Sequence, residues 1–372
     1  MSVESNTYVN MEAELAAFKD PKLARGLIRS IEALAPERAN LMEVCGTHTV
    51  SIARNGIRAL MPEGTRLLSG PGCPVCVTSN RDIDTVIALA RVPGVTITTF
   101  GDMLRVPGST SSLLKEKAAG CAIEVVYSPL DAIKYAQDHP DEQVVFVGVG
   151  FETTTPLVAI AIKRASALNL ANFSVFVAHK NMPNALEAIV SDPSLEVNAL
   201  ILPGHVSTII GAEPYRFLAR KYGIPGVITG FEPVDVLQGI AMLMRQLHEG
   251  RAEIEIAYAR GVMEQGNPVA KAAIDEVFET CTATWRGLGP IPDSGYCIRE
   301  QFAAYDAVAR FDPEIEPTQD PKGCRCGDVL RGAMAPDACP LFINGVCSPE
   351  NPVGPCMVSS EGSCAAYYRY YR

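Results

Sequence analysis

Cysteine is the residue type that says most about the chemistry this chain could perform. Twelve of its 372 residues are cysteines. Cys73 and Cys76 stand in the sequence GPGCPVC, after a run typical of a strand and before one typical of a helix. A C-x-x-C pair in that position forms a disulfide or shares one metal ion. The glycines on either side of Pro71 permit the sharp turn that this arrangement needs. The motif therefore predicts redox-active thiols or a metal site.

A second motif, CGTHT at residues 45–49, follows the strand-like run LMEV and precedes a helical run. Cys45 would then lie at a helix N-terminus, where free amides and the helix dipole stabilise a thiolate. His48 is close enough in sequence to act as a base or a second ligand, and Thr47 lies between them. We expect a reactive or metal-binding thiolate here, and a buried cysteine beside a capping threonine is the alternative.

The C-terminal segment contains six further cysteines: Cys324, Cys326, Cys339, Cys347, Cys356 and Cys364. Four thiolates hold a 4Fe-4S cluster, so a cluster here would leave two of them spare. A structural zinc site is the main competitor, and the lack of histidine in the segment fits either metal. Segments so rich in Gly and Pro bury little apolar surface, which favours folding around a metal. The remaining solitary cysteines are expected to be small buried apolar residues: Cys121, Cys281 and Cys297.

Polar side chains that follow other strand-like runs are candidates for the walls of the same site. The sequence GVGFETTTP at residues 148–156 lacks the third glycine of a dinucleotide loop and the lysine of a P-loop. We therefore interpret Glu152 and Thr153 as lining a cleft opposite the cysteines. His179 and His205 also follow strand-like runs, and we expect both in the site wall.

The elements that must position these residues alternate along the chain. Short runs rich in Val, Ile or Thr end in Gly, Pro or a polar loop, and helical runs lie between some of them. These runs are LMEV, TRLLSG, VTITTF, IEVVYS, VVFVGVG, SVFVAH, ALILPG and GVITGF. Such alternation predicts parallel sheets covered by helices, which bind ligands at the carboxyl ends of their strands. Residues 11–35 and 262–283 are predicted to be helical.

An internal similarity suggests that the chain contains two related units. Pro71-Gly72 aligns with Pro203-Gly204, and Pro93-Gly94 aligns with Pro225-Gly226 at the same offset. Cys73 then corresponds to His205, so the first unit carries the thiols. A chance similarity between two βαβ segments is the alternative.

We therefore predict an α/β fold with two similar parallel-sheet units and a mainly helical or loop domain that carries the cysteine-rich segment. The strand signals fade after about residue 245. The expected extents are 41–140 for the first unit, 141–245 for the second, and 1–40 with 246–372 for the cysteine-rich domain.

Charge and hydropathy exclude several classes of protein. The net charge is -10, and Lys and Arg form no block, which argues against nucleic acid because phosphate binding needs clustered cations. No apolar run reaches the roughly 18 residues that a membrane span needs, and the N-terminus does not resemble a secretory signal. We expect a cytoplasmic protein, and clustered cysteines in that compartment are usually metal ligands or redox thiols.

Taken together, the motifs resemble those of the HypD family, which acts in the maturation of NiFe-hydrogenases. The matching segments are CGTHT at 45–49, GPGCPVC at 70–76, GFETTTP at 150–156, PGHVSTIIG at 203–211 and the cysteine-rich end from CRCGDVLRG to SCAAYYRY. The resemblance covers nearly the whole chain. It implies two Rossmann-like halves, a 4Fe-4S domain and a complex with the small chaperone HypC. That complex would carry iron with cyanide and carbonyl ligands, and HypE would deliver the cyanide.

The resemblance also implies a role for each group of thiols. Cys45 would bind the iron that carries cyanide and carbonyl, and Cys73 and Cys76 would be the redox-active pair. The cluster ligands would be Cys324, Cys339, Cys347 and Cys364, with Cys326 and Cys356 as spare thiols. The expected function is thus a redox-capable scaffold for assembly of the Fe(CN)2CO moiety. A stand-alone iron-sulfur thiol-disulfide oxidoreductase is the alternative, and a zinc-bearing interaction module ranks third.

Overall fold

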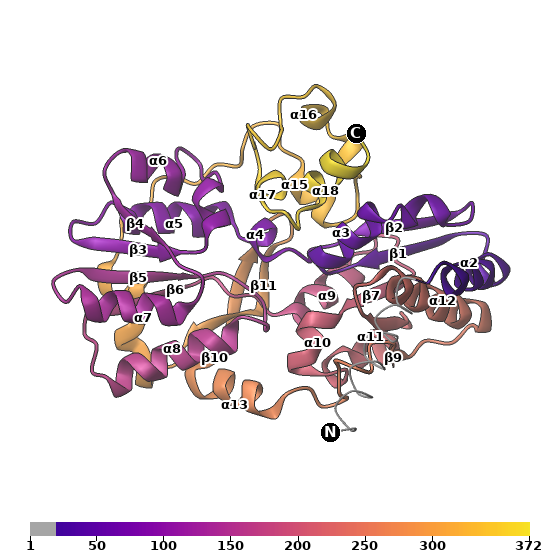
Figure 1. Ribbon diagram of the computed structural model, residues 1–372, viewed down its shortest axis with the longest axis horizontal. Helices are drawn as coiled ribbons and strands as arrows, with labels where there is room; N and C mark the ends of the chain where they lie inside the picture. Colours follow the sequence, from indigo (N-terminus) through magenta and orange to yellow (C-terminus); the bar gives the residue numbers. More distant parts are fainter. Residues whose placement is uncertain (1–19) are drawn as a thin grey trace, which may run out of the picture.

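Two parallel sheets organise the computed structural model, which describes residues 20–372 (Figure 1). The first sheet has five strands in the order β2-β1-β7-β8-β9, namely β2 (Thr65–Ser69), β1 (Ala39–Glu43), β7 (Ala199–Pro203), β8 (Gly226–Thr229) and β9 (Ile254–Ile256). The second has four in the order β4-β3-β5-β6, namely β4 (Ala122–Val125), β3 (Val95–Thr99), β5 (Gln143–Gly148) and β6 (Phe173–Val177). All the strand-like runs of the sequence form strands, and the predicted α/β class is confirmed.

Helices cover both faces of each sheet, which is why the strands are apolar on both sides. The lobe of the first sheet contains α2 (Pro21–Leu34), α3 (Gly46–Arg54), α9 (Met182–Val190), α10 (Gly204–Ile210), α11 (Arg216–Tyr222) and α12 (Pro233–Glu249). In β1, Leu41 packs in the cluster under α2 and α12, whereas its neighbour Met42 packs in the central cluster on the other face. Of the predicted helix 11–35, residues 11–19 lie outside the described residues, and the remainder forms α2.

The lobe of the second sheet is built in the same way. It contains α5 (Asn80–Ala90), α6 (Leu113–Ala118), α7 (Pro129–Asp138) and α8 (Thr155–Ala167). Val145 of β5 joins the central cluster with α5, and Val144 joins the cluster with α7 and α8. Short 3-10 turns complete the connections: η1 (Ile57–Leu60), η2 (Gly101–Arg105), η3 (Glu213–Tyr215), η4 (Glu300–Tyr305) and η5 (Pro336–Ala338). Within residues 20–372, no helix is both long and apolar enough to cross a membrane.

The chain passes from the first sheet to the second and back again. β1 and β2 lie in the first sheet, β3 to β6 form the second, and β7 to β9 return to the first, where β7 pairs with β1. The expected extents 41–140 and 141–245 therefore do not coincide with the two sheets. The similar Pro-Gly pairs at 71–72 and 203–204 follow β2 and β7, which flank β1 in one sheet. The carboxyl ends of β2 and β7 lie at the same edge of this one sheet, so the two Pro-Gly pairs do not mark two separate sheet units.

The region after residue 245 contains strands that the sequence analysis did not predict. The helix expected over 262–283 is limited to α13 (Pro268–Val277), because β10 (Phe278–Trp285) begins there and pairs antiparallel with β11 (Gly289–Ile298). α14 (Ala307–Phe311) follows the hairpin. β11 contains two prolines and Asp293 in a left-handed conformation, and this irregularity hides the strand from a period-two pattern.

The hairpin also corrects the expectation for two solitary cysteines. Cys281 of β10 and Cys297 of β11 form a disulfide, and Cys297 is exposed rather than buried. The prediction that both are small buried apolar residues is therefore wrong. The sequence separation of 16 gave no indication of the pairing, because the hairpin itself was not apparent.

The cysteine-rich C-terminal segment consists of short helices joined by loops. These are α15 (Cys326–Leu330), α16 (Pro340–Ile343), α17 (Pro355–Val358) and α18 (Ser363–Tyr370). Figure 1 shows this segment, in yellow, packed over the junction of the two lobes. α18 contacts α3, and both α15 and α17 contact α4 (Pro74–Val77). The segment therefore covers the helices that carry the two N-terminal cysteine motifs.

The fold predicts a large effect for a small substitution at Gly72. A methyl group at this position would collide with the backbone nitrogen and Cα of Cys45. Gly72→Ala should lower the free energy of unfolding by about 1–3 kcal/mol, as for other overpacked sites. Urea unfolding of wild type and variant measures the difference.

Gly26→Ala in α2 is the matched control, since a methyl group there meets no atom within 4 Å. It should leave stability unchanged or raise it by up to about 1 kcal/mol. A Gly72→Ala protein as stable as the wild type would contradict the close backbone contact.

Candidate functional site

Cys45 lies where the sequence places it, between β1 and the first turn of α3. The backbone amides of Thr47 and His48, at the start of the helix, act to lower the pKa of the Cys45 thiol, although the Cys45 side chain makes no capping hydrogen bond to α3. Burial nevertheless raises the pKa of the Cys45 thiol to about 12, and the nearby charges of Glu361 and Glu43 add to the rise. The amides alone do not stabilise the thiolate, whereas a cation bound at the sulfur would supply the opposite charge that ionisation requires.

Glu43 holds the turn that presents Cys45, a role that the sequence analysis missed. Its Oε2 accepts a hydrogen bond from the Cys45 amide at 3.2 Å, and its Oε1 accepts one from the Thr49 hydroxyl at 2.6 Å. Burial raises the pKa of Glu43 to about 8. A carboxylate in the otherwise apolar run LMEV was the available signal, because a strand buries such a group only when it has partners.

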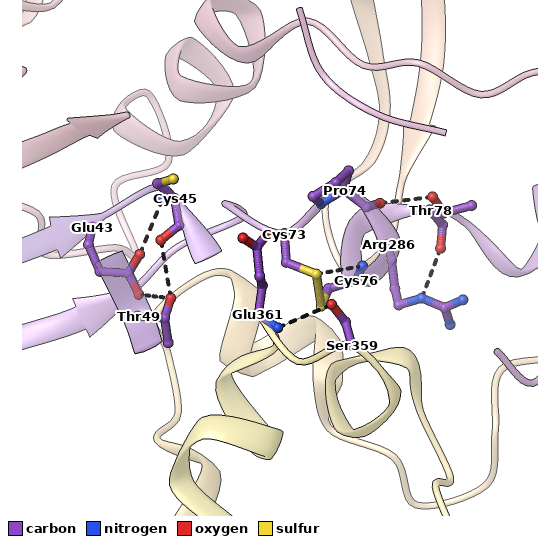
Figure 2. Close-up of a disulfide and its surroundings, with 10 residues drawn as sticks. All are labelled: Glu43, Cys45, Thr49, Cys73, Pro74, Cys76, Thr78, Arg286, Ser359 and Glu361. Atoms are coloured by element: carbon purple, nitrogen blue, oxygen red, sulfur yellow. Dashed lines mark hydrogen bonds between the residues drawn. A yellow bond between two sulfur atoms is a disulfide. The ribbon is translucent and has the colours of Figure 1, made fainter. Parts of the chain in front are cut away.

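The C-x-x-C motif lies directly against the Cys45 turn. The Gly46 amide donates to the Gly72 carbonyl at 3.0 Å, which joins the two motifs through their backbones. Cys73 and Cys76 form a disulfide at the start of α4, and the Cys76 amide donates to the Cys73 sulfur at 3.2 Å. Both residues are buried. Figure 2 shows Cys45 to the left of the Cys73–Cys76 disulfide.

A pocket of about 360 Å³ opens beside Cys45. Its polar wall includes Cys45, Thr47, Thr153, Thr154, His205 and Glu361. These residues come from the β1–α3 turn, the loop before α8 of the other lobe, α10 and the C-terminal segment. The pocket therefore forms only when both lobes and the C-terminal segment are in place. It brings together Cys45, Thr47, Thr153 and His205, as the sequence analysis expected.

Glu361 is the pocket residue that the sequence analysis missed. Its Oε1 accepts a hydrogen bond from the Thr47 hydroxyl at 2.8 Å. Its side chain lies over Gly46, where an added methyl group would be 2.6 Å from the Glu361 Cβ atom. Glu361 is the acidic residue between the last two cysteines, but its role depends on how the segment docks, and this is not visible locally.

The His48 ring faces away from the cysteine whose motif it shares. Its Nε2 lies 3.1 Å from the carbonyl oxygen of Thr229 and 3.0 Å from that of Gly230, so this nitrogen carries the proton. The ring stacks on Phe231, and burial lowers the pKa of His48 to about 4. The neutral ring thus anchors the loop after β8. The influence of His48 on the Cys45 thiol comes from its backbone amide, which acts to lower the pKa of that thiol.

Glu152 and His179, which were expected in the site wall, are buried outside the pocket lining. The Glu152 Oε1 accepts a hydrogen bond from the Met182 amide at 2.9 Å, and burial raises the pKa of Glu152 to about 7. The His179 ring fills the space left by Gly148, where a methyl group would be 2.8 Å from the ring. In the motif GFETTTP it is therefore Thr153, rather than its acidic neighbour, that reaches the pocket.

The cysteines of the C-terminal segment gather around Cys326. The Cys326 thiol is close enough to Cys324, Cys356 and Cys364 to shift the pKa of each of these three thiols. Within residues 20–372, no three Cys, His, Asp or Glu side chains surround one point at metal-ligand spacing. Among these described residues, the thiols are thus near one another without forming a metal site. The four cluster ligands implied by the family resemblance stay a prediction.

The chemistry of these donors fits a sulfur-ligated metal centre. All six cysteines are buried except Cys324, which is partly exposed, and all six are free thiols. The Cys347 sulfur accepts hydrogen bonds from the amides of Val353, at 3.4 Å, and Gly354. Amide donors of this kind stabilise thiolates that bind a cluster.

The Cys73–Cys76 disulfide should be reversible. Protein trapped by alkylation in denaturant should carry no label on these residues when it is oxidised, and two labels after treatment with a dithiol. Mass spectrometry of the peptide that contains both cysteines measures the labels. Cys121, a free thiol, is the internal control and should be labelled under both conditions. Full labelling of Cys73 and Cys76 in air-exposed protein would contradict the disulfide and favour metal sharing.

Comparisons with known proteins match nearly the whole chain to one family. A family model described as "HypD: Hydrogenase formation hypA family" matches residues 22–371. The hydrogenase maturation factor HypD of Azotobacter vinelandii is 50% identical over 364 residues, covering 95% of this chain and 96% of that protein. The HypD of Rhodobacter capsulatus is 47% identical over 365 residues, covering 95% and 97%. A putative hydrogenase expression/formation protein of Methanocaldococcus jannaschii is 42% identical over 356 residues, covering 95% and 98%. The chain therefore belongs to the HypD family of hydrogenase maturation factors.

Proposed function

We propose that this chain is the cytoplasmic scaffold on which iron acquires cyanide and carbonyl ligands during NiFe-hydrogenase maturation. The partners would be a HypC-type chaperone and a HypE-type cyanide donor. The observation that carries the proposal is the pocket beside Cys45, which a disulfide and a cysteine-rich segment both adjoin. Iron bearing cyanide and carbonyl needs soft thiolate donors, and this pocket offers one.

In this proposal Cys45 binds the substrate iron through its sulfur, and the amides at the start of α3 assist its ionisation. A single protein thiolate leaves the iron underligated, so a partner would supply a second donor. The hydrogen bond from Thr47 to Glu361 fixes the C-terminal segment over the turn. Apolar pocket residues such as Phe151 exclude water from the metal ligands.

The remaining thiols would supply redox capacity. Reduction of the Cys73–Cys76 disulfide consumes two electrons and two protons and yields two thiols. A 4Fe-4S cluster, when bound by Cys324, Cys339, Cys347 and Cys364, supplies one-electron transfer. Because α4 packs against α15 and α17, the disulfide and the cluster-binding segment belong to one packed unit.

A stand-alone thiol-disulfide oxidoreductase with an iron-sulfur cluster is the second candidate. The buried disulfide beside a pocket favours it, since such a pocket could admit a small substrate. Turnover of a small disulfide by the purified chain without any partner protein would support this activity, and its absence would favour the scaffold.

Replacement of the pocket thiol tests the scaffold directly. Cys45→Ala should remove the cyanide and carbonyl infrared bands from the complex with a HypC-type partner, because the iron loses its protein ligand. The variant should keep the brown colour of the C-terminal cluster and should abolish hydrogenase maturation in cells. Cys121→Ala, which changes a cysteine outside the pocket lining, is the control and should retain the bands. Bands of full intensity in Cys45→Ala would place the iron elsewhere.

The cluster is tested by metal analysis after anaerobic purification. We expect about four irons per chain, as a 4Fe-4S cluster requires. Cys339→Ser or Cys347→Ser should bleach the cluster, whereas Cys326→Ser or Cys356→Ser should bleach it less. Stoichiometric zinc without iron would refute the cluster, and equal bleaching by all four variants would refute the choice of ligands.

A further inference from the structure

Arg286, at the end of β10, is a buried cation that the site described above does not use. Its side chain is almost fully enclosed, with 7% of the residue exposed. Its Nη2 is buried and has no hydrogen-bond partner among the described residues. A guanidinium keeps its charge when buried, and an unpaired buried donor is costly. The position therefore calls for a negatively charged neighbour.

On one side, Arg286 is tied to the segment that follows the C-x-x-C motif. Its backbone amide donates to the Val77 carbonyl at 2.9 Å, and its Nε donates to the Thr78 carbonyl at 3.0 Å. The Thr78 hydroxyl in turn donates to the Pro74 carbonyl at 2.9 Å. Figure 2 shows this chain of contacts leading from Arg286 to the helix that carries the disulfide.

On the other side, Arg286 reaches the cysteines of the C-terminal segment. It lines a pocket of about 200 Å³ together with Cys324 and Cys326. The next residue, Gly287, packs so closely on Gly327 that a methyl group at Gly287 would collide with the Gly327 Cα. The hairpin end thus bridges the helix of the disulfide and the helix that begins at Cys326.

The other charged residues of this pocket are already paired. Arg325 and Arg331 both form ion pairs with Asp328. Asp320 accepts a hydrogen bond from the Asn80 side chain at 2.6 Å. Among residues 20–372, Arg286 forms no ion pair with a carboxylate, so its charge is not neutralised by another side chain of the pocket.

We propose that Arg286 is a positioning residue that joins the disulfide helix to the cysteine-rich segment and makes the centre held by those cysteines easier to reduce. The inference rests on the proposed function, which places a cluster there. Uptake of one electron from an external donor adds a negative charge to the cluster and breaks no bond. A fixed cation nearby stabilises that charge, and the potential of a cluster depends on such charges and on hydrogen bonds.

Two substitutions separate charge from hydrogen bonding. Arg286→Gln keeps N–H donors and removes the charge, whereas Arg286→Lys keeps the charge and alters the fork of donors. The readout is a dye-mediated redox titration of the cluster in the anaerobically purified full chain, followed by electron paramagnetic resonance. At the potential where half of the wild-type cluster is reduced, Arg286→Gln should contain about ten oxidised clusters for each reduced one. This ratio corresponds to a midpoint potential that is lower by about 59 mV for a one-electron step. Arg286→Lys should stay within about twofold of the wild type.

Arg325→Gln is the matched control, because it removes from the same pocket a cation that is half-exposed to solvent and paired with Asp328. It should leave the titration unchanged. An unchanged Arg286→Gln protein, or equal shifts in Arg286→Gln and Arg286→Lys, would overturn the proposal. Should Arg286→Gln fail to fold, Arg286→Met, which retains the apolar stem, is judged by the same criterion. Wild-type protein without iron would instead refute the cluster of the proposed function itself.

Discussion

The direct backbone contact between Gly72 and Cys45 is the constraint on which the site depends. No side chain separates the two motifs, so the helix that begins at Cys45 and the helix that carries the disulfide start next to each other. Gly46 also lacks a side chain, and Glu361 packs directly against its Cα from the C-terminal segment. Three segments that are distant in sequence can therefore stack around one thiol. Larger residues at these glycines would move the thiol away from both its neighbours.

The fold could be predicted from local pattern as far as the individual strands and helices, but not as far as their assembly. Apolar runs such as VVFVGVG indicate buried parallel strands because both faces of the sheet are covered. The pairing of Leu41 with Ala199 helps to decide which strands share a sheet. No pattern in the sequence around either residue indicates it. The hairpin was missed because β11 is interrupted by prolines, and with it the disulfide between Cys281 and Cys297.

The candidate site could be predicted where its residues follow strands and face outward. Cys45, Thr47, Thr153 and His205 satisfy the rule that parallel sheets place ligands at strand ends, and all four line the pocket. The rule cannot say which way a side chain turns. The His179 ring and the Glu152 carboxylate were therefore placed in the wall, and the His48 ring beside Cys45 as a base or ligand, although all three are buried outside the pocket lining. The surroundings of Glu361 and Arg286 depend on long-range contacts that a single sequence does not show locally.

The return of the chain to its first sheet has a consequence for biosynthesis. β1, which leads to Cys45, lies between β2 and β7, so one of its edges stays unpaired until residues 199–203 have left the ribosome. The last wall of the pocket arrives only with Glu361, more than 300 residues after Cys45 has been made. A nascent polypeptide that has not yet reached residue 361 therefore has no complete pocket around Cys45. The order of synthesis itself thus delays completion of the pocket until both lobes and the C-terminal segment are present.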